Sequence, residues 1–254
     1  MAKGPSSPWR RGGRARDVGP APNPRPSAGS SGGAGGGFAP LRIHPTGGGV
    51  TVLTREELVQ RRDRFARRNA QYLGLGHDRL AAAAFVAEAA GEGPASVLDV
   101  GTGKGLLALA LARRGLRVTS VDLDADEQAL AALMAEEAGV RDRIVFQCAD
   151  AASLPHETGS FDAVASMDAL HHFGSQGPIL RELARVLRQG GRMVLADFTE
   201  EGFALVSRIH AGEGHEHPRS AVTLDSAVAF LEGLGFSLLD RSQGHLQDRA
   251  LLRK

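Results

Sequence analysis

The chain has 254 residues, of which 42% are hydrophobic and 23% are charged, and its formal net charge is +1 at pH 7. This length suffices for one α/β domain with a sizeable core, and the composition is ordinary for a globular protein. The single cysteine, Cys148, excludes an internal disulfide and a cluster of thiolate metal ligands. No run of about 18 apolar residues is present that would span a membrane.

The first 49 residues differ from the rest in composition and charge. They carry seven basic side chains and one acid, Asp17, a net charge of +6, so the remainder carries −5. Gly, Pro, Ser and Arg dominate them, which predicts a disordered extension over 1–49. No apolar segment follows Arg10-Arg11, so an export signal is not predicted and we expect a cytoplasmic protein. The mildly acidic remainder gives no reason to expect nucleic-acid binding.

Two helices are predicted before the first strand. Thr54 and Glu57 have the spacing of a capping box, which predicts that a highly charged helix begins there. The segment 69–76, which contains two glycines, is predicted to end it. Apolar residues at helical spacing predict a second helix over 79–90. We interpret residues 50–93 as a helical lid on a domain that extends to residue 254.

From Val97 onward, predicted strands alternate with predicted helices. Such alternation predicts a parallel sheet with right-handed crossovers and helices on both faces, the doubly wound, Rossmann-like α/β class. Strands are predicted at 97–100, 117–122, 143–148, 161–167, 192–198, 236–240 and about 246–252. Helices are predicted at 104–114, 126–138, 178–188 and 224–234. The apolar neighbours of Cys148 predict that its thiol is buried.

A glycine-rich turn follows the first predicted strand. Asp99 near the end of that strand precedes three glycines at alternate positions, Gly101, Gly103 and Gly105. Glycines are needed where the backbone takes positive φ or where a ligand contacts bare backbone. The dinucleotide motif G-x-G-x-x-G would place its third glycine at position 106, which is Leu106. The turn alone leaves a nicotinamide-dependent oxidoreductase open as an alternative.

Acidic residues follow the next two predicted strands. Asp122 closes the second strand, 17 residues after Gly105. A carboxylate at that position can accept hydrogen bonds from ribose hydroxyls, which suits S-adenosylmethionine or NAD equally. Asp150 follows the third strand, where an ordinary turn acid is the alternative interpretation.

Two later segments complete a set of four ordered motifs. Phe161-Asp162-Ala163-Val164 opens the fourth strand, and Leu170-His171-His172-Phe173 follows it. Further on comes Leu183-Ala184-Arg185-Val186-Leu187-Arg188-Gln189-Gly190-Gly191-Arg192. With the glycine turn, these segments resemble class I S-adenosylmethionine-dependent methyltransferases of the type 11, ubiquinone/menaquinone-biosynthesis-like group. The resemblance covers about 95–200, and Gln189 stands where that group usually has proline.

The resemblance implies a fold, a cofactor and a binding site. The implied strand order is 3-2-1-4-5-7-6 with the seventh strand antiparallel, and the implied cofactor is S-adenosylmethionine. Asp99 would organise the methionine end of the cofactor, and Asp150 would accept a hydrogen bond from the adenine amino group. Residues 95–200 would form the cofactor-binding core. The residues implied to contact the cofactor are Asp99, Gly101, Thr102, Gly103, Gly105, Asp122, Leu123, Asp150, Ala151 and Met167.

Histidines supply the candidate catalytic groups. His171 and His172 lie at the predicted active edge of the sheet, where either could act as a general base; the alternative is that they only bind backbone or pack over the cofactor. The segment 198–223 is interpreted as an acceptor-site insertion with a flexible loop. The spacing of its histidines is not that of a standard zinc site, so we expect histidines that contact substrate or are merely solvated, rather than a metal site. The candidate cluster there is Asp197, His210, Glu213, His215 and His217, with His215 as the catalytic candidate.

The sequence therefore predicts methyl transfer by in-line displacement to an O, N or C atom of a small-molecule acceptor. Lys104, at the variable position of the glycine turn, is interpreted as a solvated or substrate-facing charge. Two alternatives stay open: a nicotinamide-dependent oxidoreductase, and a methyltransferase-like module that binds the cofactor without turnover.

Overall fold

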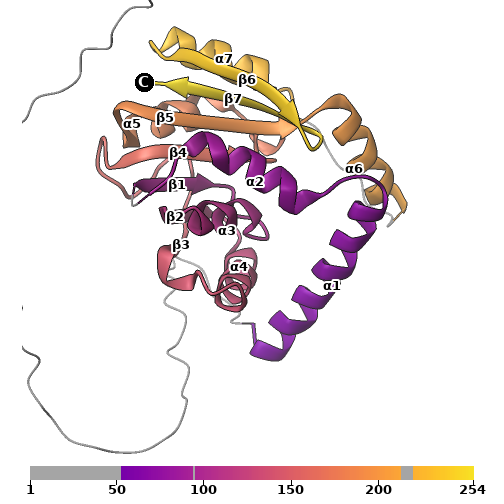
Figure 1. Ribbon diagram of the computed structural model, residues 1–254. Coiled ribbons are helices and arrows are strands. Elements are labelled where there is room, and N and C mark those ends of the chain that lie inside the picture. Colours follow the sequence, from indigo (N-terminus) through magenta and orange to yellow (C-terminus); the bar gives the residue numbers. More distant parts are fainter. Residues whose placement is uncertain (1–52, 94, 213–219) are drawn as a thin grey trace, which may run out of the picture. The chain divides into compact units, whose positions relative to one another are not determined.

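The computed structural model describes residues 53–93, 95–212 and 220–254. Within these residues, seven strands form one sheet in the order β3-β2-β1-β4-β5-β7-β6 (Figure 1). Strands β1 to β5 pair in parallel, and β7 is antiparallel to β5 and β6. The predicted α/β class and strand order are confirmed. The strands are β1 (Ser96–Val100), β2 (Arg117–Asp122), β3 (Ile144–Cys148), β4 (Phe161–Met167), β5 (Leu187–Phe198), β6 (Ser237–Gly244) and β7 (Gln247–Arg253).

The sheet has an apolar core on each face, because successive strand residues point to opposite sides. Val97 and Val194 pack on one face with helices α2, α3 and α4. Leu98 and Leu195 pack on the other face with α5 and α7. The helices are α1 (Arg55–Gly74), α2 (Arg79–Ala90), α3 (Leu106–Arg113), α4 (Ala125–Glu137), α5 (Gln176–Val186), α6 (Glu200–Gly212) and α7 (Leu224–Gly233), with short 3₁₀ turns η1 (Arg141–Arg143) and η2 (Leu170–His172).

Helix α1 begins as predicted but is longer than predicted. The capping box of Thr54 and Glu57 is present at its start. The expected break over 69–76 is wrong, because the helix continues to Gly74. The reason is tertiary: Tyr72 is only 4% exposed and packs against α6. Its apolar contacts there are Leu205, Val206 and Ile209.

Helix α6 replaces part of the flexible loop predicted for 198–223. Gly202 allows this helix to approach the β6–β7 turn, since a Cβ at that position would lie 2.7 Å from the carbonyl oxygen of Leu246. His210 lies in the last turn of α6. Three members of the predicted histidine cluster, Glu213, His215 and His217, lie outside the described residues.

Two smaller expectations are also wrong. Strand β5 begins at Leu187, five residues earlier than position 192, and its pairing with β4 is irregular between Phe161 and Ala163. The thiol of Cys148 is half-buried rather than buried, and its Sγ lies 3.2 Å from the carbonyl oxygen of Leu123.

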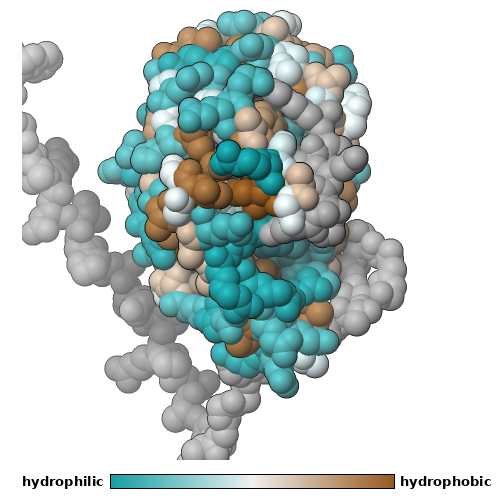
Figure 2. Space-filling view, turned by 90° about the vertical axis from the view of Figure 1, so that its right-hand side faces the viewer, coloured by the Kyte–Doolittle hydropathy of each residue, from teal (hydrophilic) through white to brown (hydrophobic). Residues whose placement is uncertain are grey.

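Helices α1 and α6 lie on the same side of the sheet, where β5 ends and the chain enters α6 (Figure 1). Figure 2 shows this side of the molecule, on which hydrophilic residues predominate around a smaller apolar area. In the part of the chain that the structure describes, no helix is long and apolar enough to cross a membrane.

Candidate active site

The glycine turn between β1 and α3 has the predicted backbone. Gly101, Gly103 and Gly105 have φ values of 82°, 47° and 80°, in the left-handed region that favours glycine. A Cβ at Gly101 would lie 2.7 Å from Cβ of Ala169, and one at Gly105 would lie 2.8 Å from Cβ of Ala131. A Cβ at Gly103 would meet nothing within 4 Å. The outer two glycines therefore permit close packing, while the middle one leaves its backbone open to a ligand.

Asp122 at the end of β2 lies across this turn. One oxygen of its carboxylate accepts a hydrogen bond from the Gly103 N–H at 2.8 Å, and the other accepts one from the Asp124 N–H at 3.0 Å. The next residue, Leu123, is 71% exposed. The carboxylate is thus fixed at the carboxyl edge of the sheet beside an exposed apolar side chain, on which a planar ring could stack.

Asp150 lies in the loop that follows β3, the strand next to β2. Cys148 pairs with Asp122 in the β2–β3 register, which places the loop after β3 at the same edge of the sheet. The Asp150 side chain is exposed and accepts a hydrogen bond from the Ala152 N–H at 2.8 Å. Ala151 between them is half-buried. In this structure Asp150 therefore makes the contacts of a turn acid, and its predicted role at the adenine amino group stays a prediction.

A chain of buried hydrogen bonds supports the turn from below. Ser120 Oγ donates to Oδ2 of Asp99 at 2.6 Å and lies 2.6 Å from the hydroxyl of Thr102. The side-chain amide of Gln128 donates to the same hydroxyl at 2.9 Å. Asp99 is thereby coupled to the glycine turn through Ser120. Ser120 and Gln128 belong to no motif, so neither could be singled out from the sequence.

Asp99 is a buried carboxylate with one oxygen left over. It is 1% exposed, and Oδ1 has no hydrogen-bond partner in the described structure. Burial raises its pKa to about 7, with the charge of Asp122 acting in the same direction and the hydrogen bond from Ser120 opposing it. An unsatisfied buried oxygen costs roughly 1–3 kcal/mol. A donor supplied by a ligand, such as an amino group, would satisfy it.

The residue after β4, Asp168, sits in a strained backbone conformation beside Met167, which is half-buried. Its φ is 56°, which is rare for a residue other than glycine. The side chain accepts a hydrogen bond from Gln247 Nε2 at 2.8 Å. Desolvation raises the pKa of Asp168 to about 7, assisted by the charge of Asp197, while Gln247 and Arg79 act in the opposite direction.

Arg79 is a cation that the sequence analysis missed. It begins α2, and its guanidinium lies over the rings of Phe65 and Tyr72, with 5.3 and 5.0 Å from Cζ to the ring centroids. Its Nη1 donates to the side-chain oxygen of Asn69 at 3.1 Å. The charge of Arg79 lowers the pKa of Asp168, so the guanidinium acts electrostatically on that carboxyl group. No motif singles out this arginine.

His171 is paired with Asp197. Nδ1 of the imidazole lies 2.7 Å from Oδ1 of the carboxylate, and the His171 N–H donates to Oδ2 at 3.1 Å. The side chains are 2% and 6% exposed. The ring of Phe203 meets that of His171 edge-on at 5.2 Å between centroids. The sequence groups Asp197 with the later histidines, whereas in the structure its carboxylate contacts His171.

His172 differs from its neighbour in exposure. It is exposed, and its ring centroid lies 4.1 Å from that of His171. Desolvation and the neighbouring His171 lower the pKa of His172, while Asp197 opposes them and His210 of α6 adds to them. The lowered pKa favours the neutral form of His172, which is the form that can accept a proton.

Comparison with known proteins finds relatives of the central part of the chain. A methyltransferase domain matches residues 98–195. Over 103 residues the chain is 40% identical to 27-O-demethylrifamycin SV methyltransferase of Amycolatopsis mediterranei (strain S699), which covers 40% of this chain and 38% of that protein. Over 158 residues it is 35% identical to ubiquinone biosynthesis O-methyltransferase of Xanthomonas axonopodis pv. citri (strain 306), covering 58% and 65%. The chain thus spans between 38% and 65% of these two relatives.

Solved structures share the fold. A putative S-adenosyl-L-methionine-dependent methyltransferase of Methanococcus maripaludis aligns with a TM-score of 0.57 at 16% identity, covering 81% of this chain and 97% of that one. The [4+2]-cyclase SpnF aligns with a TM-score of 0.55 at 23% identity, covering 69% and 81%. These identities show the fold alone, and the second protein is named for a reaction other than methyl transfer.

Proposed function

We propose that this chain is an S-adenosylmethionine-dependent methyltransferase of a small molecule, because residues 98–195 match the methyltransferase domain and the sheet has the Rossmann-like strand order. The observation that carries the proposal is the pairing of Asp122 with the Gly103 N–H, at the edge where β1 and β2 end. The backbone at Gly103 is open to a ligand, and the Asp122 carboxylate beside it is held in place. Together they suit the binding of an adenosyl group.

The residues present fit S-adenosylmethionine at several points. The glycine turn is open at Gly103, where a Cβ would meet nothing within 4 Å. Leu123 offers an exposed apolar surface for the adenine, and Asp122 offers acceptors for the ribose hydroxyls. Asp99 Oδ1 is a buried acceptor that lacks a donor, as expected where an amino group binds. Arg79 is the cation we assign to the carboxylate at the methionine end.

When bound, the cofactor supplies a methyl group activated by the positive charge of its sulfonium. The protein then has to bind donor and acceptor at attack distance and exclude water, which can contribute several kcal/mol to lowering the barrier. Backbone of the glycine turn and the acids at the strand ends hold the donor. Helices α1 and α6 lie at the side of the sheet where β5 ends (Figure 1), and we propose that the acceptor enters there.

We assign the removal of a proton from the acceptor to the His171–Asp197 pair. With Asp197 as the acceptor of an Nδ1–H, the other ring nitrogen, Nε2, is the atom that would take up the proton of the methyl acceptor. His172 is the second candidate, because it is exposed and its pKa is lowered. Carbon acceptors also lose a proton, and the same pair serves them.

The acceptor itself is proposed only as a small molecule, handled in the cytoplasm, with no nucleic-acid partner. The acidic balance of residues 50–254 supports the last point, because nucleic-acid binding surfaces carry excess positive charge. The predicted roles of His215 and of the rest of the 213–219 segment stay part of this proposal, since they lie outside the described residues.

The proposal is tested by calorimetric titration of the full chain with S-adenosylhomocysteine, NAD and NADP. We expect binding of S-adenosylhomocysteine alone; binding of NAD or NADP instead would support the oxidoreductase alternative and overturn the proposal. A second assay follows release of S-adenosylhomocysteine on a panel of small-molecule acceptors. Tight binding without release on any of them would favour the cofactor-binding module, or a non-methylating reaction.

A further inference from the structure

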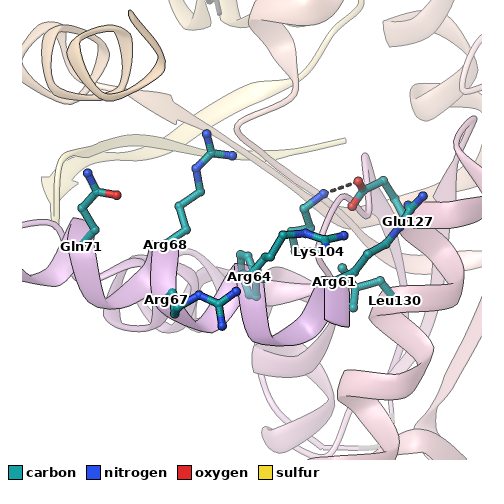
Figure 3. Close-up of a pocket in the computed structure, with 9 residues that line it drawn as sticks. Arg61, Arg64, Arg67, Arg68, Gln71, Lys104, Glu127 and Leu130 are labelled. Atoms are coloured by element: carbon teal, nitrogen blue, oxygen red, sulfur yellow. Dashed lines mark hydrogen bonds and ion pairs between the residues drawn. The ribbon is translucent and has the colours of Figure 1, made fainter. Parts of the chain in front are cut away.

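Several arginines of helix α1 face the glycine-rich turn. Arg61, Arg64 and Arg68 recur at intervals of three and four residues, which places them on one side of the helix. A cavity of about 610 Å³ lies between this side of α1 and the region of the glycine turn and α4. Figure 3 shows the side chains that line it, with Lys104 and Glu127 opposite the helix. The lining residues are Arg61, Arg64, Phe65, Arg67, Arg68, Gln71, Lys104, Glu127 and Leu130.

Charge in this cavity is unbalanced. Five cationic side chains line it against one carboxylate, Glu127. Glu127 forms an ion pair with Lys104, and Arg61 lies 2.8 Å from Asp126 at the start of α4. Arg64 and Arg67 are exposed and have no acidic partner within the described ranges. The end of α1 nearer to its N-terminus is thus matched by acids of α4, whereas positive charge is left over toward the middle of the helix.

The cavity also has an apolar part and a link to the cofactor site. Phe65 and Leu130 are 6% and 2% exposed and give it an apolar floor. Lys104 belongs to the glycine turn and directly follows Gly103, whose backbone is open. The volume lies within the range of small-ligand sites, roughly 300–1,000 Å³. A molecule with an apolar body and an anionic group would match both kinds of wall.

We propose that this cavity receives an anionic group of the methyl acceptor, a carboxylate or a phosphate. Guanidinium groups bind both anions through paired N–H donors, and arginine is preferred over lysine for such contacts. The inference rests on the proposed function, because it places the acceptor beside the glycine turn. Arg64 and Arg67 bind the anion, and Lys104, already paired with Glu127, borders it. An acidic protein surface would match the cavity less well than a small molecule. Its side chains would have to reach Phe65 and Leu130, which are almost fully buried.

The first experiment uses the full chain saturated with S-adenosylhomocysteine, titrated calorimetrically with inorganic pyrophosphate and with succinate. The test variant is Arg64→Gln/Arg67→Gln. The matched control is Arg62→Gln, which is on the same helix but does not line the cavity and pairs with Asp63 and Glu137. We expect wild type and control to bind at least one probe, and the double variant to bind it about tenfold more weakly or worse.

The second experiment compares acceptors of the panel as matched pairs of free acid and methyl ester. The double variant should raise KM for the acid about tenfold and leave that for the ester unchanged. The inference would be overturned if KM rose equally for the acid and for its methyl ester. It would also be overturned if wild type and double variant bound the probes with the same affinity. A drop in affinity for S-adenosylhomocysteine in the double variant would also overturn it, since the arginines would then serve the cofactor. Failure of wild type to bind S-adenosylhomocysteine at all would instead overturn the proposed function.

Discussion

Nδ1 of His171 and Oδ1 of Asp197 lie 2.7 Å apart at the ends of the paired parallel strands β4 and β5. Twenty-six residues separate them in the chain, yet both are almost completely withdrawn from solvent. An ionised Asp197 would favour the tautomer with its proton on Nδ1, which leaves Nε2 as the nitrogen of the proposed base.

Replacing Asp197→Asn should impair turnover without affecting donor binding. The amide keeps the shape of the carboxylate but no longer holds His171 as the tautomer with a proton on Nδ1. We expect kcat to fall about 100-fold, within the range that general acid–base catalysis contributes, and affinity for S-adenosylhomocysteine to stay within twofold. Steady-state kinetics on a responsive acceptor and calorimetry measure the two quantities.

The variant His172→Gln is the matched comparison for this prediction. If His171 is the base, His172→Gln retains most of the wild-type kcat and its pH profile. A large loss in His172→Gln together with a nearly normal Asp197→Asn would reassign the base to His172.

Removing the Asp122 carboxylate should weaken donor binding. Hydrogen bonds to a charged acceptor contribute roughly 1.5–3 kcal/mol each, so Asp122→Ala is expected to reduce affinity for S-adenosylhomocysteine by ten- to a hundredfold or more. Asp142→Ala, at an exposed acid in η1, is the control and should bind normally. Unchanged affinity in Asp122→Ala would mean that the ribose is held elsewhere.

Two glycines of the turn should respond differently to alanine. Gly105→Ala places a Cβ 2.8 Å from Cβ of Ala131, inside the α3–α4 packing, so it should lower the free energy of unfolding by roughly 1–3 kcal/mol. Gly103→Ala meets no protein atom within 4 Å and should cost only about 1 kcal/mol of backbone strain. It should nevertheless lose most affinity for S-adenosylhomocysteine, because the methyl group occupies the open side of the turn. Urea unfolding and calorimetry separate the two effects.

The buried acids make stability depend on pH in an uncommon direction. The pKa values of Asp99 and Asp168 are raised from 3.8 to about 7, so between these values the folded chain binds protons that the unfolded chain releases. The unfolding free energy therefore falls as pH rises from about 4 to about 7, by up to roughly 1.4 kcal/mol per pH unit for each group. Below about pH 4 the protonated Asp99 and Asp168 contribute fully to the free energy of unfolding, and above about pH 7 this contribution is lost.

Asp99→Asn isolates this effect, since an amide does not titrate. Relative to wild type, the variant should be more stable at pH 8 than at pH 5, as measured by urea unfolding at both values. The difference between variant and wild type is the quantity to follow, because other carboxylates, such as Asp162 with its lowered pKa, give the whole protein an opposite slope at lower pH. A difference that does not change with pH would show that Asp99 is ionised in the folded chain throughout this range.

Much of the fold was predictable because the strand–helix alternation and the glycine turn are local patterns. The continuation of α1 through Asn69 was not, since it depends on Tyr72 packing against α6, a helix more than 100 residues away in the chain. Helix α6 was not predicted, because residues such as Gly202 and His210 are typical of a loop. The close approach of Gly202 to Leu246 is a tertiary contact that the local sequence does not reveal.

The candidate site divides in the same way. Gly101, Gly103 and Gly105 have the backbone that their spacing predicts. The support beneath them was invisible, because Ser120 reaches Asp99 only through the β1–β2 register, where Asp99 pairs with Ser120. Arg79 carries no signal either, as one basic residue at the start of a helix among many arginines. The sequence suggests Asp197 only as a member of the histidine cluster, whereas the pairing of β4 with β5 brings it to His171.

Helix α1 precedes the segment that matches the methyltransferase domain, yet it supplies six of the nine side chains around the arginine-lined cavity. Exposed positions such as Arg64 and Arg67 can be exchanged at little cost in stability. If the cavity binds the acceptor as proposed, acceptor preference can diverge among related chains through substitutions on this one helix, without any change at the sheet edge proposed to bind the methyl donor.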